Sequence, residues 1–364
     1  MVFVRKIATA ALTGVLFFAY LTSAQTKTAT SSPSAFDIYS QGDMAFYHKD
    51  YVKAMQFYRQ AADLGYARAQ ADIGFLYSRG LGVETNYEEA MKWSLKAAES
   101  NDDEAESNLG WMYQAGLGVP VDYFEAMKWY KKAADQGNLL ATNNLGWLYL
   151  NGLGVAPDPA EALRWFRKAA DMNYPSSQTQ VGDFYLRGLV VPQDYETALM
   201  WFHKSANNGD AGGLNQIGWM YQSGLGVPQD YKEAMKWYQK SAAIGFAAAE
   251  YNIGWIYGHI EPKDYSEAMK WYLKAAAHGH TEAQNNIGFI YENGLQVKQD
   301  YSEAAKWYQL AADGGSFRGQ FHLGSLFDRG LGVPHDEETA RQLMLLAAAA
   351  GDQDALKWLS EHSR

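Results

Sequence analysis

The sequence predicts an all-α solenoid, and three observations carry that prediction. One phrase returns along almost the whole chain of 364 residues, apolar residues at helical spacing flank it, and only Gly or Asn closes each copy. Self-similarity at a fixed period of this size is typical of stacked helical hairpins. The phrase centres on a glycine that recurs every 36 residues, with one interval of 34, at Gly74, Gly110, Gly146, Gly182, Gly218, Gly254, Gly288 and Gly324.

The copy over residues 105–137 shows why two helices are expected in each repeat. Its first helix, helix A, ends at Gly116, where the chain can turn left-handed without a side-chain penalty. Its second helix, helix B, begins after Asp122, which can cap the helix together with Glu125 in an Asp version of the capping box. The same pair recurs as Asp230 and Glu233, Asp264 and Glu267, and Asp300 and Glu303.

The end of helix B is predicted in every repeat, because Gly and Asn adopt positive φ most readily. Nine such ends give nine hairpins and eighteen helices within residues 35–364, which we expect to form one long domain. A last amphipathic segment, Asp354 to His362, is predicted to cap the final hairpin. The nine ends are Gly65, Asn101, Gly137, Asn173, Gly209, Gly245, Gly279, Gly315 and Gly351.

The first 24 residues predict a signal peptide. Arg5 and Lys6 precede a short apolar run, and Thr22-Ser23-Ala24 offers small residues for cleavage after Ala24. The apolar run is too short for a membrane anchor, so we expect none after cleavage. Residues 25–34 are polar and predict a flexible linker. The protein is therefore expected in the periplasm or outside the cell.

Composition limits the class of partner. The chain has 31 Lys and Arg against 41 Asp and Glu, a net charge of −10, which argues against nucleic acid or anionic lipid. The chain has no cysteine, so no disulfide or lipidated cysteine contributes. We expect a monomer stabilised by packing alone.

The phrase LG-x-x-Y-x-x-G-L-G-V-x-x-D-Y-x-E-A-x-K-W-Y-x-K-A-A-x-x-G, over about residues 67 to 350, resembles the Sel-one-like repeat, a branch of the tetratricopeptide-like α-solenoids. The resemblance implies a right-handed superhelix of antiparallel helix pairs that serves as an adaptor for protein or glycan partners. Well-known secreted members tie each hairpin with a disulfide, which this chain cannot form.

Two repeats deviate from the phrase. In the repeat of Gly182, Asp183 replaces the aromatic that follows the glycine, and Val190 replaces the second glycine of the linker. In the repeat of Gly254, the linker over residues 258–262 is two residues shorter. The curvature is expected to change at both places, either as a functional break in the groove or through sequence drift.

Tryptophan occurs in two registers. On helix B, three residues after a repeated alanine, it is predicted to fill the core, at Trp93, Trp129, Trp165, Trp201, Trp237, Trp271 and Trp307. In the superhelices that the chain resembles, helix A lines the concave surface, so the resemblance places a second set in the groove. The alternative is that this set only packs against the adjacent hairpin. The second set directly follows the helix A glycine, at Phe75, Trp111, Trp147, Trp219, Trp255 and Phe289.

Polar side chains accompany the second set on the same helix face. Asn and Gln offer a donor and an acceptor together, which suits a peptide backbone or sugar hydroxyls, and rigid aromatics supply contact area at low entropy cost. Gln114, Gln222 and Glu292 follow three residues after an aromatic. The amides predicted to line the groove are Asn108, Asn143, Asn144, Asn215, Asn252, Asn285 and Asn286.

The predicted function is an exported, non-enzymatic scaffold that binds a protein or peptide in its groove. The alternative is a glycan-binding component of cell-envelope or exopolysaccharide assembly. A β-lactamase-like hydrolase is least favoured, because Ser-x-x-Lys, Gly-x-Ser-x-Gly and His-Glu-x-x-His are all absent. His278, His280 and Glu282 share a turn without a further metal ligand. We expect no catalytic residue, metal or cofactor.

Overall fold

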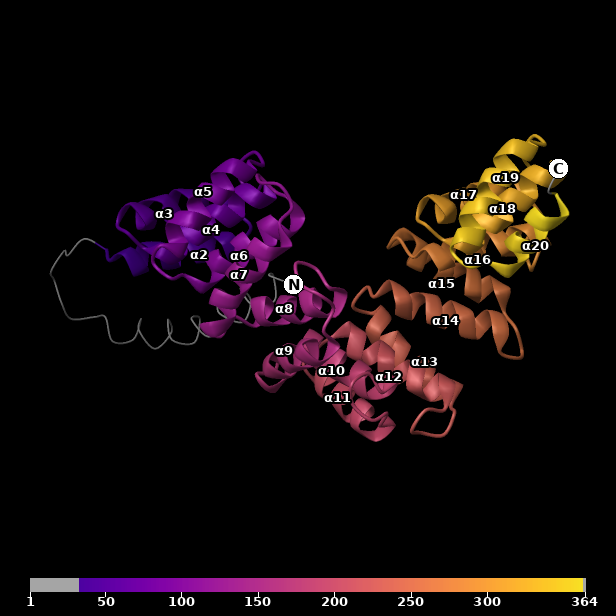
Figure 1. Ribbon diagram of the computed structural model, residues 1–364, viewed down its shortest axis with the longest axis horizontal. Helices are drawn as coiled ribbons and strands as arrows, with labels where there is room; N and C mark the ends of the chain where they lie inside the picture. The colour runs from indigo at the N-terminus through magenta and orange to yellow at the C-terminus, as the bar shows by residue number, and fades with distance from the viewer. Residues whose placement is uncertain (1–32, 363–364) are drawn as a thin grey trace. The chain divides into compact units, whose positions relative to one another are not determined.

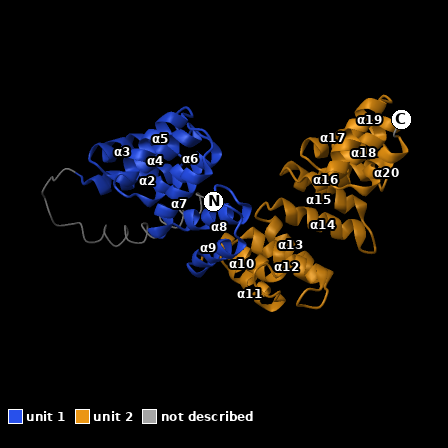
Figure 2. Ribbon diagram, in the orientation of Figure 1, with its two compact units in different colours: residues 1–172 blue, residues 173–364 orange. Residues whose placement is uncertain are grey.

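The computed structural model describes residues 33–362, which form helices without any strand. The all-α prediction is confirmed. The chain divides into two compact units, one ending at Met172 and one beginning at Asn173 (Figure 2). The predicted signal peptide and residues 25–32 of the predicted linker lie outside the described residues. Within residues 33–362, no helix combines the length and the apolar character needed to cross a bilayer.

Each unit is a run of helical hairpins (Figure 1). The N-terminal unit contains α2 (Ala35–Tyr47), α3 (Tyr51–Asp63), α4 (Ala67–Arg79), α5 (Tyr87–Ala98), α6 (Asp103–Ala115), α7 (Tyr123–Asp135), α8 (Leu139–Asn151) and α9 (Pro159–Asp171). The C-terminal unit contains α10 (Pro175–Arg187), α11 (Tyr195–Asn207), α12 (Ala211–Ser223), α13 (Tyr231–Ala242), α14 (Ala247–His259), α15 (Tyr265–Ala277), α16 (Thr281–Asn293), α17 (Tyr301–Asp313), α18 (Phe317–Arg329), α19 (Glu337–Ala349) and α20 (Gln353–Glu361).

Even-numbered helices up to α18 are A helices, and odd-numbered ones are B helices. Within each unit every helix A packs on its own helix B, and each helix B packs on the next even-numbered helix. Consecutive A helices approach each other more closely than consecutive B helices do, at α4 with α6, α6 with α8, α10 with α12 and α16 with α18. Because a stack curves toward its closer row, the A helices line the inner side of these hairpins.

The core of most hairpins is an aromatic ring from helix B set against the repeated glycine of helix A. Tyr130 is fully buried, and a Cβ atom on Gly110 would lie only 2.6 Å from its ring. The glycine is therefore required by close packing, since any side chain would displace the ring. The rings at the same place in other hairpins are Tyr58, Phe166, Phe202, Tyr238, Tyr272 and Tyr308.

The prediction that the helix B tryptophans fill the core is confirmed only in part, because most of them pack against a core cluster without being fully buried. Only Trp201 of the seven is buried, and the others are half-buried. Each tryptophan precedes the buried ring by one residue, which is a rotation of about 100° on a helix. Trp129 thus packs against the cluster that includes Met91 of α5 and Leu109 of α6, whereas Tyr130 belongs to the next cluster, between α7 and α8. Lys132 covers the outer side of Trp129, with Nζ 4.1 Å from the ring centroid.

The predicted ends of helix B are confirmed. All nine residues have positive φ, from 55° at Asn101 to 94° at Gly351. These two residue types relieve the steric penalty that other side chains would meet in the left-handed region. The repeat boundaries were therefore predictable from single residues.

The predicted capping box at the start of helix B is confirmed for the aspartate but not for the glutamate. The Asp122 side chain accepts hydrogen bonds from the backbone N–H groups of Phe124 and Glu125, as expected. The Glu125 carboxylate pairs with Lys128 instead of returning to the Asp122 backbone. The reason is that the Asp122 N–H already donates to the Tyr113 carbonyl oxygen of helix A, at 2.9 Å. Equivalent partners are found at Asp230, Asp264 and Asp300.

The two deviating repeats differ structurally from the regular ones. Val190 has a φ of 56°, a left-handed conformation that is strained for a β-branched residue. Gly118 and Gly226 occupy the corresponding place in regular repeats, with φ of 73° and 70°. In the repeat of Gly254, α14 approaches neither α12 nor α16 as closely as the other A helices of its unit approach one another. The inner row is therefore more open around α14.

Candidate functional site

The six aromatics predicted for the groove all lie on A helices, but their exposure differs. Phe75 is buried, at 9% exposed, whereas Trp147 and Phe289 are 36% and 42% exposed. Trp147 also packs edge-on against the buried Phe166, with ring centroids 5.5 Å apart. The row therefore serves the core at some repeats and the inner surface at others. Its half-buried members are Trp111, Trp219 and Trp255.

The predicted amides mostly join helices to one another. Asn143 and Asn285 are buried, at 4% exposed each. Asn252 Nδ2 donates to Asn215 Oδ1 at 3.0 Å and so links α14 to α12. Asn144 interacts with the buried Tyr130 hydroxyl. A ligand would meet only the remaining polar atoms of the half-buried amides, which are Asn108, Asn144, Asn215, Asn252 and Asn286.

The polar residues that follow the aromatics by three positions accept hydrogen bonds from buried tyrosines and do not face the inner surface as free groups. The Tyr130 hydroxyl donates to Gln114 Oε1 at 2.9 Å, and the Tyr238 hydroxyl donates to Gln222 Oε1 at 2.7 Å. The Tyr308 hydroxyl donates to Glu292 Oε2 at 2.7 Å. Burial raises the pKa of these phenols, so they remain neutral donors. These contacts belong to the core of each hairpin.

Three arginines, each the last residue of an A helix, were not predicted as site residues from the sequence. Arg79 lies over two rings, with its guanidinium carbon 5.8 Å from the Phe75 centroid and 4.5 Å from the Trp111 centroid. Arg329 Nη1 lies 3.5 Å from Glu292 Oε1. Arg187 has neither an ion pair nor a ring contact within the described residues. Each arginine lies four residues after the residue that follows the repeated glycine, a spacing that places these two residues on one helix face. This spacing could have identified the arginines from the sequence.

A hollow of about 590 Å³ lies beside Arg187, between α10, the start of α11 and α12. It opens in the repeat where Asp183 replaces the usual aromatic. Arg187 is the only charged residue among those lining it. The lining residues are Leu186, Arg187, Gln193, Tyr195, Gln216, Trp219 and Leu225.

Asp183 fixes one wall of this hollow. Gln216 Nε2 donates to Asp183 Oδ1 at 2.5 Å, which ties α12 to α10. Burial raises the pKa of Asp183, while the Gln216 hydrogen bond and the charge of Arg187 act in the lowering direction. The carboxylate is thus directed at Gln216, and it forms no ion pair with Arg187.

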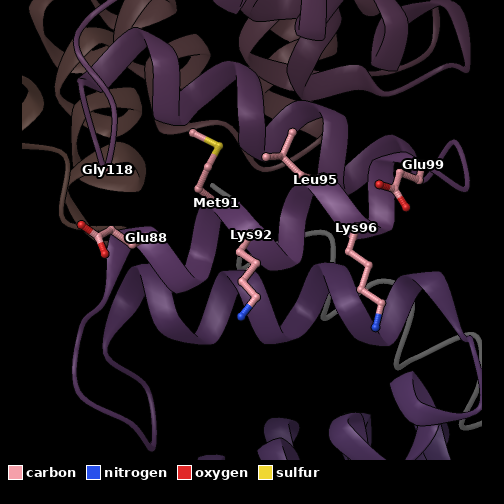
Figure 3. Close-up of a pocket in the computed structure, with 7 residues that line it drawn as sticks. All are labelled: Glu88, Met91, Lys92, Leu95, Lys96, Glu99 and Gly118. Carbon is pink, nitrogen blue, oxygen red and sulfur yellow. The ribbon is translucent and has the colours of Figure 1, made fainter.

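A second hollow of about 590 Å³ lies along α5 beside Gly118 (Figure 3). Figure 3 shows that Met91 and Leu95 point to one side of the helix, whereas Lys92 and Lys96 point to the other. Lys96 Nζ lies 5.1 Å from the Trp93 ring centroid. Because these side chains diverge and carry both signs of charge, this surface is a solvated helix face and not a convergent site.

The turn that contains three candidate metal ligands holds no convergent set. His278 Nδ1 lies 2.8 Å from Glu250 Oε2, whereas the His280 ring stacks on Tyr251 with centroids 4.5 Å apart. Glu282 Oε1 accepts a hydrogen bond from Ser316 Oγ at 2.9 Å. Among residues 33–362, no group of three His, Cys, Asp or Glu side chains is arranged to hold a metal ion.

Comparison with known proteins gives matches by sequence and by structure. The Sel1 repeat model matches nine segments, namely residues 23–66, 67–102, 103–138, 139–174, 175–210, 211–246, 247–280, 281–316 and 318–352. A protective antigen present in uropathogenic Escherichia coli strains, which displays an SLR fold, is 33% identical, with a TM-score of 0.59 over 90% of this chain and 71% of that one. A Sel1 repeat protein from Oxalobacter formigenes is 36% identical, with a TM-score of 0.60 over 67% of this chain and 99% of that one. No curated protein matches the chain.

Proposed function

Because the chain belongs to the Sel1 repeat family, we propose that it is an exported scaffold that binds an extended segment of a protein partner along its A helices. Sel1 repeat proteins generally act as protein-interaction scaffolds, and their solenoid fold is typically non-enzymatic. Export is proposed from the n-region, the short apolar run and the small residues before Gln25.

One observation carries the proposal, namely the exposed aromatics on the inner side of both units. Trp147 on α8 and Phe289 on α16 expose 36% and 42% of their surface, although their neighbours in sequence, Leu148 and Ile290, are buried. Large rigid rings of this kind are common anchors in protein interfaces. Half-buried amides on the same helices supply donors and acceptors for a peptide backbone.

Site-specific photo-crosslinking tests the assignment of this surface. A benzophenone side chain would replace Phe289 on helix A, and a matched one would replace Leu273 on helix B. Both residues are 42% exposed, so their accessibility is equal and they differ in lying on helix A or on helix B. We expect a protein adduct from position 289 in the native cell envelope and little from position 273. Equal labelling at the two positions would contradict the inner-surface assignment, and an adduct with carbohydrate would support the glycan alternative.

Export needs its own measurement. The mature protein should begin near Gln25 in an intact mass spectrum and should be found outside the cytoplasm. A protein that retains Met1, or that remains with cytoplasmic markers on fractionation, would remove export from the proposal and leave the scaffold function standing.

A further inference from the structure

We propose that the hollow beside Arg187 receives an acidic side chain of the protein partner, so that this inference rests on the proposed scaffold function. The hollow is formed by α10, α11 and α12 and is lined by one cation, one tryptophan and uncharged residues. It would supply the specificity that a row of aromatic rings alone lacks.

Three arginines at the same place in the repeat provide the comparison. Each is the last residue of its A helix. Arg79 is covered by the Phe75 and Trp111 rings, and Arg329 is paired with Glu292. Arg187 has neither kind of partner within the described residues. A guanidinium that keeps its full donor set at the wall of a hollow is suited to bind a carboxylate.

The repeat of Arg187 carries Asp183 where Phe75 stands in the repeat of Arg79, and Asp183 binds Gln216 of the hollow's wall. A phenyl ring there would lie beside the arginine, as the Phe75 ring does. The shorter aspartate leaves that volume empty, and its carboxylate is held by Gln216 at 2.5 Å instead of pairing with Arg187. The replacement of a ring by Asp183 therefore explains why the guanidinium has no ring contact from its own helix.

The remaining lining fits the stem of an acidic side chain. Trp219 offers a ring face, and Leu186 and Leu225 add apolar surface for methylene groups. The Asp183 carboxylate also interacts electrostatically with Arg187, and it weakens the attraction of Arg187 for a second carboxylate. The linker residue Val190 holds a strained left-handed conformation three residues before Gln193 of the wall, and such strain is often found near binding sites.

Fluorine NMR tests the proposal with defined probes. The full chain would carry 5-fluorotryptophan, and a Trp219→Phe variant would identify the Trp219 resonance. The probes are the α-amides of N-acetylglutamic acid and of N-acetylglutamine, which differ only in charge and in one atom. We expect the glutamic acid derivative to move the Trp219 resonance in a saturable manner, with the glutamine derivative about tenfold weaker or silent.

Variants assign the effect to the arginine. Arg187→Gln should weaken binding of the glutamic acid derivative about tenfold or more, and Asp183→Phe should weaken it by placing a ring beside Arg187, as the Phe75 ring lies beside Arg79. Arg79→Gln is the matched control, because Arg79 is already covered, and it should leave the titration unchanged. Equal response to both probes, or an unchanged titration in Arg187→Gln, would overturn the proposal. Stronger binding of glucuronate would overturn the peptide source and point to an acidic sugar.

These titrations need no partner protein, so their failure would leave the crosslinking result at Phe289 untouched. Conversely, loss of the crosslink with an intact titration would reject the proposed scaffold surface while keeping a carboxylate site at Arg187. The two proposals can therefore fail separately.

Discussion

Two aromatic rows run along the B helices one residue apart, and they contribute differently to the molecule. Tyr130 is fully buried against Gly110, whereas its neighbour Trp129 is half-buried beneath Lys132. The tryptophan row is the more conspicuous one in the sequence, yet the tyrosine and phenylalanine row fills the interior. The difference teaches that burial follows the angular position on the helix and not the size of the side chain.

The largest expected effect comes from truncating one member of each row. Tyr130→Ala should lower the free energy of unfolding by about 3 to 5 kcal/mol, the usual cost of emptying a buried aromatic site. Trp129→Ala removes a half-buried ring and should cost roughly half as much. Urea unfolding followed by circular dichroism measures both. If Trp129→Ala were the more damaging change, the assignment of the two rows would be reversed.

The next effect concerns the glycine on which the buried ring rests. Gly110→Ala would place a Cβ atom 2.6 Å from the rigid Tyr130 ring, so we expect a loss of about 1 to 3 kcal/mol from overpacking. Gly324→Ala is the matched control, because its Cβ would meet the flexible tip of Met344 at 3.2 Å and the Ala340 carbonyl oxygen and Leu343 Cβ at 3.3 Å, all farther away than the Tyr130 ring is from Gly110. There the better helix propensity of alanine should offset most of the strain. Equal melting temperatures for the two variants would show that the ring can move aside.

The sequence was sufficient for the fold because its signals were local. The Gly and Asn helix ends, the aspartate caps and the glycine period each depend on one residue and its own backbone. The assignment of the tryptophans was only partly right, because alanine spacing gives the helical period but not the rotation of the helix about its axis. The free guanidinium of Arg187 was not predictable, since it depends on where Asp183, Gln216 and Trp219 meet across two repeats.

A smaller effect is expected from removing single hydroxyl groups of the buried tyrosine and phenylalanine row on the B helices. The Tyr238 hydroxyl donates to Gln222, so Tyr238→Phe should cost about 1 kcal/mol by leaving that amide unpaired. The Tyr272 hydroxyl is buried and makes no hydrogen bond of normal geometry in the described structure, because Gly258 provides no side chain at the place of Gln222 and only the Asn286 side chain acts on it. Tyr272→Phe should therefore leave stability unchanged or raise it. Chemical denaturation of both variants decides, and equal losses would mean that Tyr272 has a partner in solution.

The smallest effect concerns the lysines that cover the tryptophan row of the B helices. Lys240 Nζ lies 4.0 Å from the Trp237 ring centroid, a contact worth about 0.5 to 1 kcal/mol at an exposed site. Lys240→Gln should lose this contribution, whereas Lys236→Gln, four residues earlier on α13, should be nearly neutral because Lys236 forms only an exposed ion pair with Glu233. Thermal unfolding of both variants at low and high salt separates the two contacts, because the ion pair is the more strongly screened. If the two substitutions had the same effect, the lysine over the ring would contribute no more than an ordinary surface charge. The tryptophan row would then stabilise the hairpins through its half-buried rings alone.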